Sequence, residues 1–324
     1  MIFTAKAPGK IIIAGEHFVV HGSFALAAAI DRGATVHASL SDQSSISSKK
    51  LGLTAELPNK IPYKLTPLAK VLKATLNYLE ENRKVKIEME SDLPFSAGLG
   101  SSAAGSIALV AAASSALGHT LKKEEIINLA MVSEKIIHGN PSGIDPAIST
   151  QGGVILFKKG ISQRPLKLKT PIDFIVCFSG SGQSTSKMIR KFSQTKYINP
   201  STFKALIDSS SKLVEIAASA LINGDINLLA SILNFNHVVL SSLGVSSKRL
   251  DILVESTLKA GCIGAKMTGG GGGGCIIALP RAGEVDDVLK KISKNTIEAW
   301  KVSIPMAGVS VRRGNESAKI HQMD

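Results

Sequence analysis

The sequence predicts an α+β protein of two domains. Its 324 residues are about twice the length of a typical single domain. Strand-like and helical patterns occur in both halves without the strict strand–helix–strand alternation of a doubly wound parallel sheet. Between 158 and 171 the chain becomes basic and polar and contains two prolines. We therefore expect domains at 1–165 and 166–324.

The elements of the N-terminal domain follow from the periodicity of its apolar residues. Apolar runs on either side of Pro8-Gly9 predict two short strands, and leucines at helical spacing predict a helix in the middle of this half. In chain order, we expect strands at 2–7 and 10–14, a small apolar stretch at 24–30, a strand at 34–40, a Ser-rich loop at 41–50, a helix at 67–83, a strand at 85–89, helices at 103–118 and 122–138, and a strand at 153–157. The Thr120 hydroxyl is the expected cap of the third helix.

The C-terminal domain opens on an apolar strand and continues with amphipathic helices. A run of six glycines then leads directly into another apolar strand, with no polar spacer between them. In chain order, we expect a strand at 174–178, helices at 202–223, 226–242 and 248–260, a strand at 275–279, a helix at 285–293 and a strand at 299–304.

Composition excludes several classes of protein. The net charge of +13 invites a nucleic-acid-binding interpretation, but aromatic residues make up only 4 % of the chain and no zinc-finger or RNA-recognition pattern occurs. A basic surface also suits an enzyme that acts on polyanions. We expect no membrane span, because the best candidate, 103–118, is rich in Ala, Ser and Gly and too short.

The cysteines and the first residues indicate a cytoplasmic protein. Cys177, Cys262 and Cys275 are widely spaced and form no CxxC pair, so neither a zinc site nor a disulfide framework is indicated. Buried thiols in a reducing compartment are the expected state. The first residues lack the pattern of a secretory signal.

The strongest local signal for function is a glycine-rich segment between a strand and a helix, Pro94–Ala104. Its glycines allow backbone N–H groups to approach a ligand closely, and the helix start adds free N–H donors and a positive dipole end. This combination suits a phosphate group. Ser101 and Ser102 add hydroxyls for a phosphate oxygen or a magnesium ion. For such a turn alone, a capped helix without a ligand is the simpler interpretation, and the pattern is not a Walker A loop.

Two carboxylates form a second candidate site. Glu134 lies one turn before the end of a predicted helix, and Asp145 follows the turn after that helix. One carboxylate could hold Mg²⁺ together with ATP phosphates, and the other could accept or orient the proton of an attacking hydroxyl. The alternative is a solvated helix carboxylate and an ordinary turn residue.

Two further segments have a functional and a structural interpretation. Lys266-Met267-Thr268 precedes the glycine run 269–274, whose backbone amides could form an anion nest or a tight entry into a strand. Near the N-terminus, Lys10 enters an apolar run, so it either extends its ammonium to solvent or holds an anion in a cleft. His17, taken alone, is more typical of a hydrogen-bonded core histidine.

Taken together, these segments resemble the three ordered motifs of the GHMP kinase superfamily. The motifs correspond to Lys6–His17, Pro94–Ala104 and Lys266–Gly274, and the resemblance spans about residues 3–310. It implies a two-domain fold, with a ribosomal-protein-like N-terminal domain, a ferredoxin-like C-terminal domain and the active site in the cleft between them. Within the superfamily, 15–22 and 137–145 are most similar to mevalonate kinases. Pro146 and Gly270 depart from the usual pattern.

The resemblance implies a role for each matching residue. Asp145 matches the catalytic carboxylate and Lys10 the lysine that pairs with it, whereas Ser102 and Glu134 match Mg²⁺ ligands. The matching ATP-binding residues are Pro94, Ser96, Ala97, Gly98, Leu99, Gly100, Ser101, Ser102, Ala103 and Ala104. The matching substrate-binding residues are Lys10, Glu16, His17, Asp145, Thr185, Gly270 and Gly271.

The implied activity is ATP-dependent phosphorylation of the C5 hydroxyl of mevalonate to 5-phosphomevalonate, a step of isoprenoid biosynthesis. It would proceed by direct Mg²⁺-assisted transfer, with small molecules as its partners and no nucleic acid or membrane. Homodimers are common in the family. The alternatives are another small-molecule GHMP kinase, such as a phosphomevalonate or sugar kinase, and a non-catalytic basic RNA-binding protein, since the N-terminal domain of the family resembles a ribosomal protein.

Overall fold

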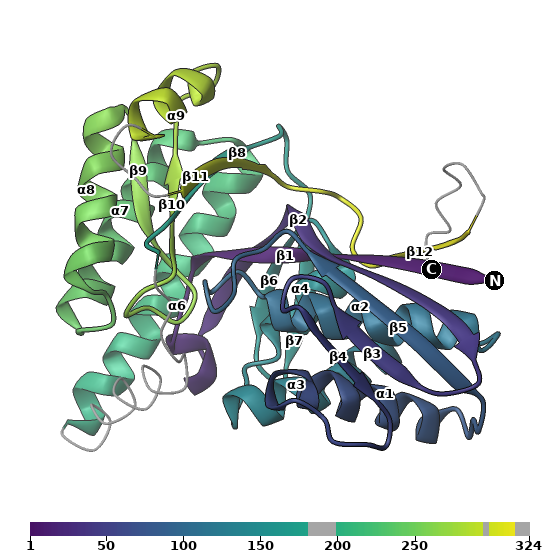
Figure 1. Ribbon diagram of the computed structural model, residues 1–324. Coiled ribbons are helices and arrows are strands. Elements are labelled where there is room, and N and C mark those ends of the chain that lie inside the picture. Colours follow the sequence, from purple (N-terminus) through teal and green to yellow (C-terminus); the bar gives the residue numbers. More distant parts are fainter. Residues whose placement is uncertain (181–198, 294–297, 315–324) are drawn as a thin grey trace.

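A computed structural model of the chain describes residues 1–180, 199–293 and 298–314. Figure 1 shows two sheets, each covered by its own helices, with the end of β1 reaching the junction between them. The first sheet has eight strands: β1 (Ile2–Ala14), β2 (Phe24–Ser41), β3 (Ser45–Ser48), β4 (Leu53–Glu56), β5 (Lys84–Ser91), β6 (Val154–Lys158), β7 (Ser162–Leu166) and β12 (Ser310–Arg313). Six of them follow the order β12-β1-β2-β5-β3-β4, and β6 pairs with both β2 and β7.

The first strand is longer than its sequence predicts. Pro8 lacks a backbone N–H and Gly9 allows an irregular backbone, so we expected a break between two strands. Instead, β1 continues through both residues with a shift of register between them. The structure accommodates the Pro-Gly pair as a bulge, which brings Lys10 to the inner end of a strand that begins at the edge of the molecule.

Four helices cover the first sheet: α1 (Thr66–Tyr78), α2 (Ser101–Ala116), α3 (Lys123–His138) and α4 (Ile144–Gln151), with short 3₁₀ turns at Phe18–His21 and Tyr63–Leu65. Helix α2 packs directly on β1 and β2 and is flanked by α1 and α3. It is buried along most of its length. Small residues allow this close approach between the helix and the sheet.

The second sheet confirms the ferredoxin-like prediction. Its strands β8 (Asp173–Phe178), β9 (Gly264–Thr268), β10 (Cys275–Leu279) and β11 (Glu298–Ser303) lie in the order β11-β8-β10-β9, and all three pairings are antiparallel. Counted along this domain the order is 4-1-3-2. Helices follow its first and third strands, which is the split β-α-β arrangement. These helices are α6 (Pro200–Asn223), α7 (Ile226–Ser242), α8 (Lys248–Ala260) and α9 (Val285–Ser293).

Several local predictions were wrong. The expected loop at 41–50 contains β3, which pairs in parallel with β5 and buries Ile46. Helix α3 starts at Lys123, and the carboxylate of Glu125 accepts the N–H of Lys122, so Thr120 is not the cap. Asp145 lies in the first turn of α4 rather than in a loop. Strand β3 depends on its pairing with β5, which the periodicity of the sequence does not reveal.

The position of the domain boundary stays a prediction, and one strand from the end of the chain, β12, belongs to the first sheet. Strand β7 ends at Leu166, and the second sheet begins at Asp173. However, β12, which follows the second sheet in the chain, pairs with β1. The two sheets also share a hydrophobic core, in which Ile11 and Leu26 of the first sheet meet Phe174 and Ile277 of the second. The halves are therefore packed against each other as well as linked.

None of the helices in the described part of the chain is both long enough and apolar enough to cross a membrane. The cysteines Cys177, Cys262 and Cys275 are buried as free thiols. Burial raises the pKa of Cys177 to about 12 and that of Cys262 to about 12. These thiols therefore remain protonated and unreactive at neutral pH.

Candidate active site

The three motifs meet at one cavity of about 640 Å³. Its wall combines the inner end of β1, the glycine loop before α2, the end of α3, the start of α4 and the beginning of the glycine run after β9. Residues that are far apart in the sequence thus surround a single space. The predicted site residues that line it are Lys10, Glu16, His17, Ser96, Ala97, Gly98, Gly100, Ser101, Ser102, Glu134, Asp145 and Gly270.

The glycine loop presents the start of α2 to this cavity. Gly100 is the N-cap residue, in the left-handed conformation with a φ of 73°, and no side chain caps the helix. A Cβ at this position would lie 3.0 Å from Cγ of Lys10. The first-turn N–H groups and the positive end of the helix dipole therefore lie at the cavity wall, where an anion would be stabilised.

The second glycine run supports the loop through backbone contact. A Cβ on Gly269, whose φ is +81°, would stand 2.7 Å from both Cα and O of Gly98. Next to this contact, the N–H of Cys275 donates to the carbonyl of Ala97 at 3.1 Å. The run is therefore not a free hinge, because it packs against the phosphate-loop candidate with no side chain between them.

Lys10 and Asp145 face each other across the cavity. The Lys10 side chain is 3 % exposed, its Nζ lies 3.5 Å from Oδ1 of Asp145, and it donates to the carbonyl of Gly98 at 2.8 Å. The alternative of an ammonium extended to solvent is thereby excluded. Asp145 is oriented by the first turn of α4, which follows the left-handed Gly143. One lysine therefore links the carboxylate to the glycine loop.

Glu134 and Ser102 form a site suited to a divalent cation. Burial, reinforced by the negative charge of Asp145, raises the pKa of Glu134 to about 8, and the Ser102 hydroxyl acts against this rise. Oε1 of Glu134 is buried and has no hydrogen-bond partner among the described residues. A hydroxyl and an unsatisfied carboxylate oxygen are hard ligands of the kind that Mg²⁺ takes together with phosphate oxygens.

The two candidate metal ligands lie on helices α2 and α3, which are hydrogen-bonded to each other near these ligands. One turn beyond Ser102 on α2, the hydroxyl of Ser106 hydrogen-bonds that of Ser133, the residue before Glu134 on α3, at 2.7 Å. Both serines are buried. In the described residues, no group of three or more His, Cys, Asp and Glu could hold a metal by itself. Mg²⁺ commonly completes its coordination with water and with phosphate oxygens of the substrate.

Glu16 and His17 close the floor of the cavity. Glu16 forms a fully buried ion pair with Lys266 of β9. His17, at a positive φ of 63°, is hydrogen-bonded through Nε2 to the carbonyl of Gly270 at 3.1 Å. Burial lowers the pKa of His17 to about 4, so the ring is neutral at neutral pH. These contacts join the first motif to the third.

Some predicted residues do not reach the cavity. Pro94, Leu99, Ala103, Ala104 and Gly271 are absent from its wall. Leu99, Ala103 and Ala104 are buried behind it, and a Cβ at Gly271 would lie 2.3 Å from the carbonyl of Val245. Their predicted roles in binding ATP or the substrate stay predictions. Thr185 lies outside the described residues.

Other residues of the wall carried no prediction. His138 follows Glu134 by one helical turn, with its Nε2 3.7 Å from Oε2 of that carboxylate, and the i, i+4 spacing could have indicated it. Tyr63, Met89 and Phe95 also line the cavity, and no spacing in the sequence indicated them. Lys266 is the first residue of the third motif, but the sequence did not predict its ion pair with Glu16.

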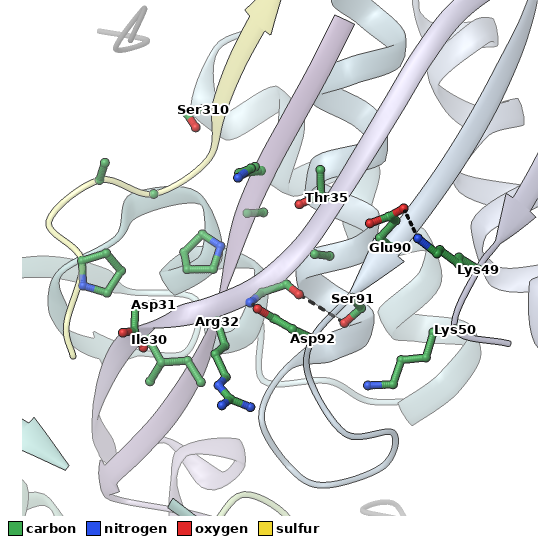
Figure 2. Close-up of a pocket in the computed structure, with 18 residues that line it drawn as sticks. Ile30, Asp31, Arg32, Thr35, Lys49, Lys50, Glu90, Ser91, Asp92 and Ser310 are labelled. Atoms are coloured by element: carbon green, nitrogen blue, oxygen red, sulfur yellow. Dashed lines mark hydrogen bonds and ion pairs between the residues drawn. The ribbon is translucent and has the colours of Figure 1, made fainter. Parts of the chain in front are cut away.

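A second hollow, of about 700 Å³, lies beside the bulge of β1 and carries none of the predicted site residues. Figure 2 shows its charged side chains, of which Lys49 pairs with Glu90 at 3.1 Å. Asp92 accepts the N–H of Gly33 at 2.7 Å, and the Arg32 guanidinium lies 4.6 Å from the centre of the Trp300 ring. The predicted site residues line the cavity between the motifs and not this hollow, so that cavity is the candidate active site.

Comparisons with known proteins show which family the chain resembles. The model of the GHMP kinases N-terminal domain matches residues 67–153, and that of the GHMP kinases C-terminal domain matches 217–298. A mevalonate kinase of Pyrococcus furiosus is 35% identical, covering 85% of this chain and 88% of that protein, and one of Aeropyrum pernix is 34% identical, covering 94% and 96%. The crystal structure of L. major mevalonate kinase in complex with R-mevalonate superposes with a TM-score of 0.80 at 26% identity, covering 94% of this chain and 96% of that one.

Proposed function

Since the chain belongs to the GHMP kinase family, we propose that it is a mevalonate kinase, which transfers the γ-phosphoryl group of ATP to the C5 hydroxyl of mevalonate. The observation that carries the proposal is the convergence of Lys10, Asp145, Glu134 and the glycine loop on one cavity. Relatives at about 35% identity and a neighbouring structure with bound R-mevalonate support the choice of substrate.

In this mechanism, Asp145 accepts the proton of the substrate hydroxyl while the oxygen of that hydroxyl forms the new bond to the γ-phosphorus of ATP. In the same step, the bond between the γ-phosphorus and the β,γ-bridging oxygen breaks, and that oxygen leaves with ADP. Lys10 holds Asp145 in place from 3.5 Å and faces the charge that develops on the transferring group. The backbone N–H groups at the start of α2 stabilise the phosphate oxygens.

Ser102 and Glu134 would hold Mg²⁺, which when bound neutralises phosphate charge. The alcohol substrate would be bound by Glu16 and His17 at the cavity floor, together with Lys10. The basic net charge of +13 favours the approach of a polyanionic nucleotide. A cytoplasmic location and a homodimer stay predictions.

The first test is a coupled ADP-release assay with Mg·ATP and mevalonate, phosphomevalonate, galactose or homoserine. We expect turnover on mevalonate alone, because a site that hydrogen-bonds one alcohol closely rejects others by large factors. The same purified protein should then yield 5-phosphomevalonate as the product detected by mass spectrometry.

Turnover on another alcohol in the panel would replace the substrate assignment while leaving a GHMP kinase mechanism in place. If no alcohol reacts and the protein shifts RNA in a salt-dependent manner, the rival non-catalytic interpretation gains support. Protein folding should be verified by circular dichroism before either conclusion is drawn.

Ser102→Ala should selectively weaken the use of Mg·ATP. The substitution removes one proposed metal ligand but leaves Lys10 and Glu16 untouched, so we expect KM for Mg·ATP to rise about tenfold with KM for mevalonate changed less than about twofold. Steady-state kinetics with each substrate varied in turn would measure this difference.

Ser115→Ala is the matched control, because Ser115 lies at the opposite end of the same helix and outside the cavity wall. Its kinetics should equal those of the wild type. A rise in KM for mevalonate alone in Ser102→Ala would contradict the assignment of Ser102 to the nucleotide side.

A further inference from the structure

Lys266 is a fully buried charge that the proposed mechanism does not use. It lies in β9 of the second sheet with a side-chain exposure of 0%. Its ammonium pairs with the Glu16 carboxylate and donates to the carbonyls of Met267, at 2.6 Å, and Ile12, at 3.3 Å. All three N–H donors of the ammonium therefore have an acceptor, which holds the charge in one place.

The partner of Lys266 faces the active site. Glu16 lines the cavity, and while its Oε1 is paired with Lys266, its Oε2 is buried without a hydrogen-bond partner among the described residues. Burial raises the pKa of Glu16, whereas the charges of Lys266 and Lys10 both act to lower it. The carboxylate is thus within electrostatic reach of two lysines, of which one lies in the second domain and the other is paired with Asp145.

We propose that Lys266 is a positioning residue for the transfer reaction, because it fixes the Glu16 carboxylate from the opposite domain. One oxygen of that carboxylate then remains available to accept a hydrogen bond from the alcohol substrate, and Lys10 remains paired with Asp145. Four charges then alternate in sign: Lys266, Glu16, Lys10 and Asp145. The inference rests on the proposed function, since it names how the substrate side of that site is held.

Without Lys266, the buried carboxylate of Glu16 would lose its paired cation. A buried carboxylate that loses its counter-charge is strongly destabilised, so it acquires a proton or attracts the next available cation. Lys10 is such a cation and lines the same cavity. Its movement toward Glu16 would take it from Asp145 and from the carbonyl of Gly98, which it contacts at 2.8 Å. Lys266 therefore acts on catalysis through Glu16.

The test compares Lys266→Met, Glu16→Gln and the double variant with the wild type, with mevalonate and Mg·ATP varied separately. For Lys266→Met we expect kcat to fall about 30-fold or more and KM for mevalonate to rise. KM for ATP should stay within about threefold, because the backbone contacts of the glycine loop with Gly269 and Cys275 remain. The double variant should recover kcat about tenfold over Lys266→Met, since the stranded carboxylate is gone. A merely structural role would not produce this recovery.

Lys301→Met is the matched control, because Lys301 also forms an ion pair in the second sheet, with Asp173 at 2.7 Å, but lies outside the cavity wall. It should leave all kinetic constants unchanged. Unchanged constants in a folded Lys266→Met, or a double variant no faster than Lys266→Met, would overturn the inference. If Lys266→Met does not fold, the double variant is compared with Glu16→Gln: equal kcat supports the inference, and a further loss of more than about tenfold contradicts it.

The assay separates this inference from the proposed function. If the wild type phosphorylates a different alcohol, the same variants are compared on that alcohol, and the substrate assignment alone is lost. If the wild type turns over none of the panel, the crystal structure of Lys266→Met is the test: Lys10 turned toward Glu16 supports the inference, and Lys10 still paired with Asp145 overturns it. If Lys266→Met does not fold, the structures of the double variant and of Glu16→Gln are compared instead. Lys10 paired with Asp145 in both of them supports the inference, and Lys10 displaced only in the double variant overturns it.

Discussion

Asp145→Asn should lower kcat by about three orders of magnitude or more while the fold survives. Asparagine has nearly the same shape as aspartate, so the first turn of α4 keeps its packing, but it cannot accept the hydroxyl proton. It also removes the negative charge that lies 3.5 Å from the Lys10 ammonium. Steady-state kinetics with saturating mevalonate and Mg·ATP measure the loss, and thermal unfolding verifies the fold. Lys10→Met should show a loss of the same kind.

The control for this variant is Asp173→Asn. Asp173 also pairs with a lysine, Lys301, and its side chain is 30% exposed, close to the 24% of Asp145, but it lies outside the cavity. We expect its kcat to equal that of the wild type. An Asp145→Asn enzyme with near-normal kcat would show that another group takes the proton, and the proposed mechanism would fail.

Gly269→Ala should separate the two glycine segments that form the nucleotide side of the cavity. The new Cβ would stand 2.7 Å from Cα and O of Gly98, both of which are backbone atoms that cannot rotate away. Together with the positive φ of 81°, this contact should lower the free energy of unfolding by about 2–4 kcal/mol. Because the phosphate loop must move, KM for ATP should rise at least about tenfold. Chemical denaturation and steady-state kinetics measure the two effects.

Gly283→Ala isolates the cost of the backbone conformation. Gly283 has nearly the same φ, 83°, but a Cβ there would meet nothing within 4 Å. It should lose only about 1–2 kcal/mol of stability and keep its KM for ATP. If both variants lost the same stability with unchanged kinetics, the contact between Gly98 and Gly269 would have no part in nucleotide binding.

Elements with a clear periodic pattern were predicted closely. The bounds of α7, α8 and α9 match the predicted 226–242, 248–260 and 285–293. An amphipathic helix shows its buried face in the spacing of its apolar residues, and this spacing does not depend on which surface covers it. The two-domain fold with a ferredoxin-like second domain, implied by the motifs, is confirmed as well.

Elements that owe their existence to a partner strand were missed. Strand β3 has the polar sequence Ser45–Ser48 and forms because β5 and β4 lie on either side of it. Strand β12 comes after the whole second sheet and yet pairs with β1. Backbone pairing supplies their stability, and a local pattern does not reveal it. Helix α4 was missed for a different reason, because its eight residues are too few to give a clear periodic pattern.

The sequence by itself determined the local parts of this protein: helices with an apolar face, a glycine loop before α2, and the glycines that later prove to allow backbone contact. Only the tertiary structure decided that Lys10 lies beside Asp145 and that Lys266 neutralises Glu16 across 250 residues of chain. Periodicity and turn chemistry depend on residues that are close together in the chain, so they can be recognised in the sequence. The partners of each buried ion pair lie far apart in the sequence, so they meet only in the folded chain. The packing of the two sheets against each other brings Lys266 to Glu16 and the three motifs to one cavity.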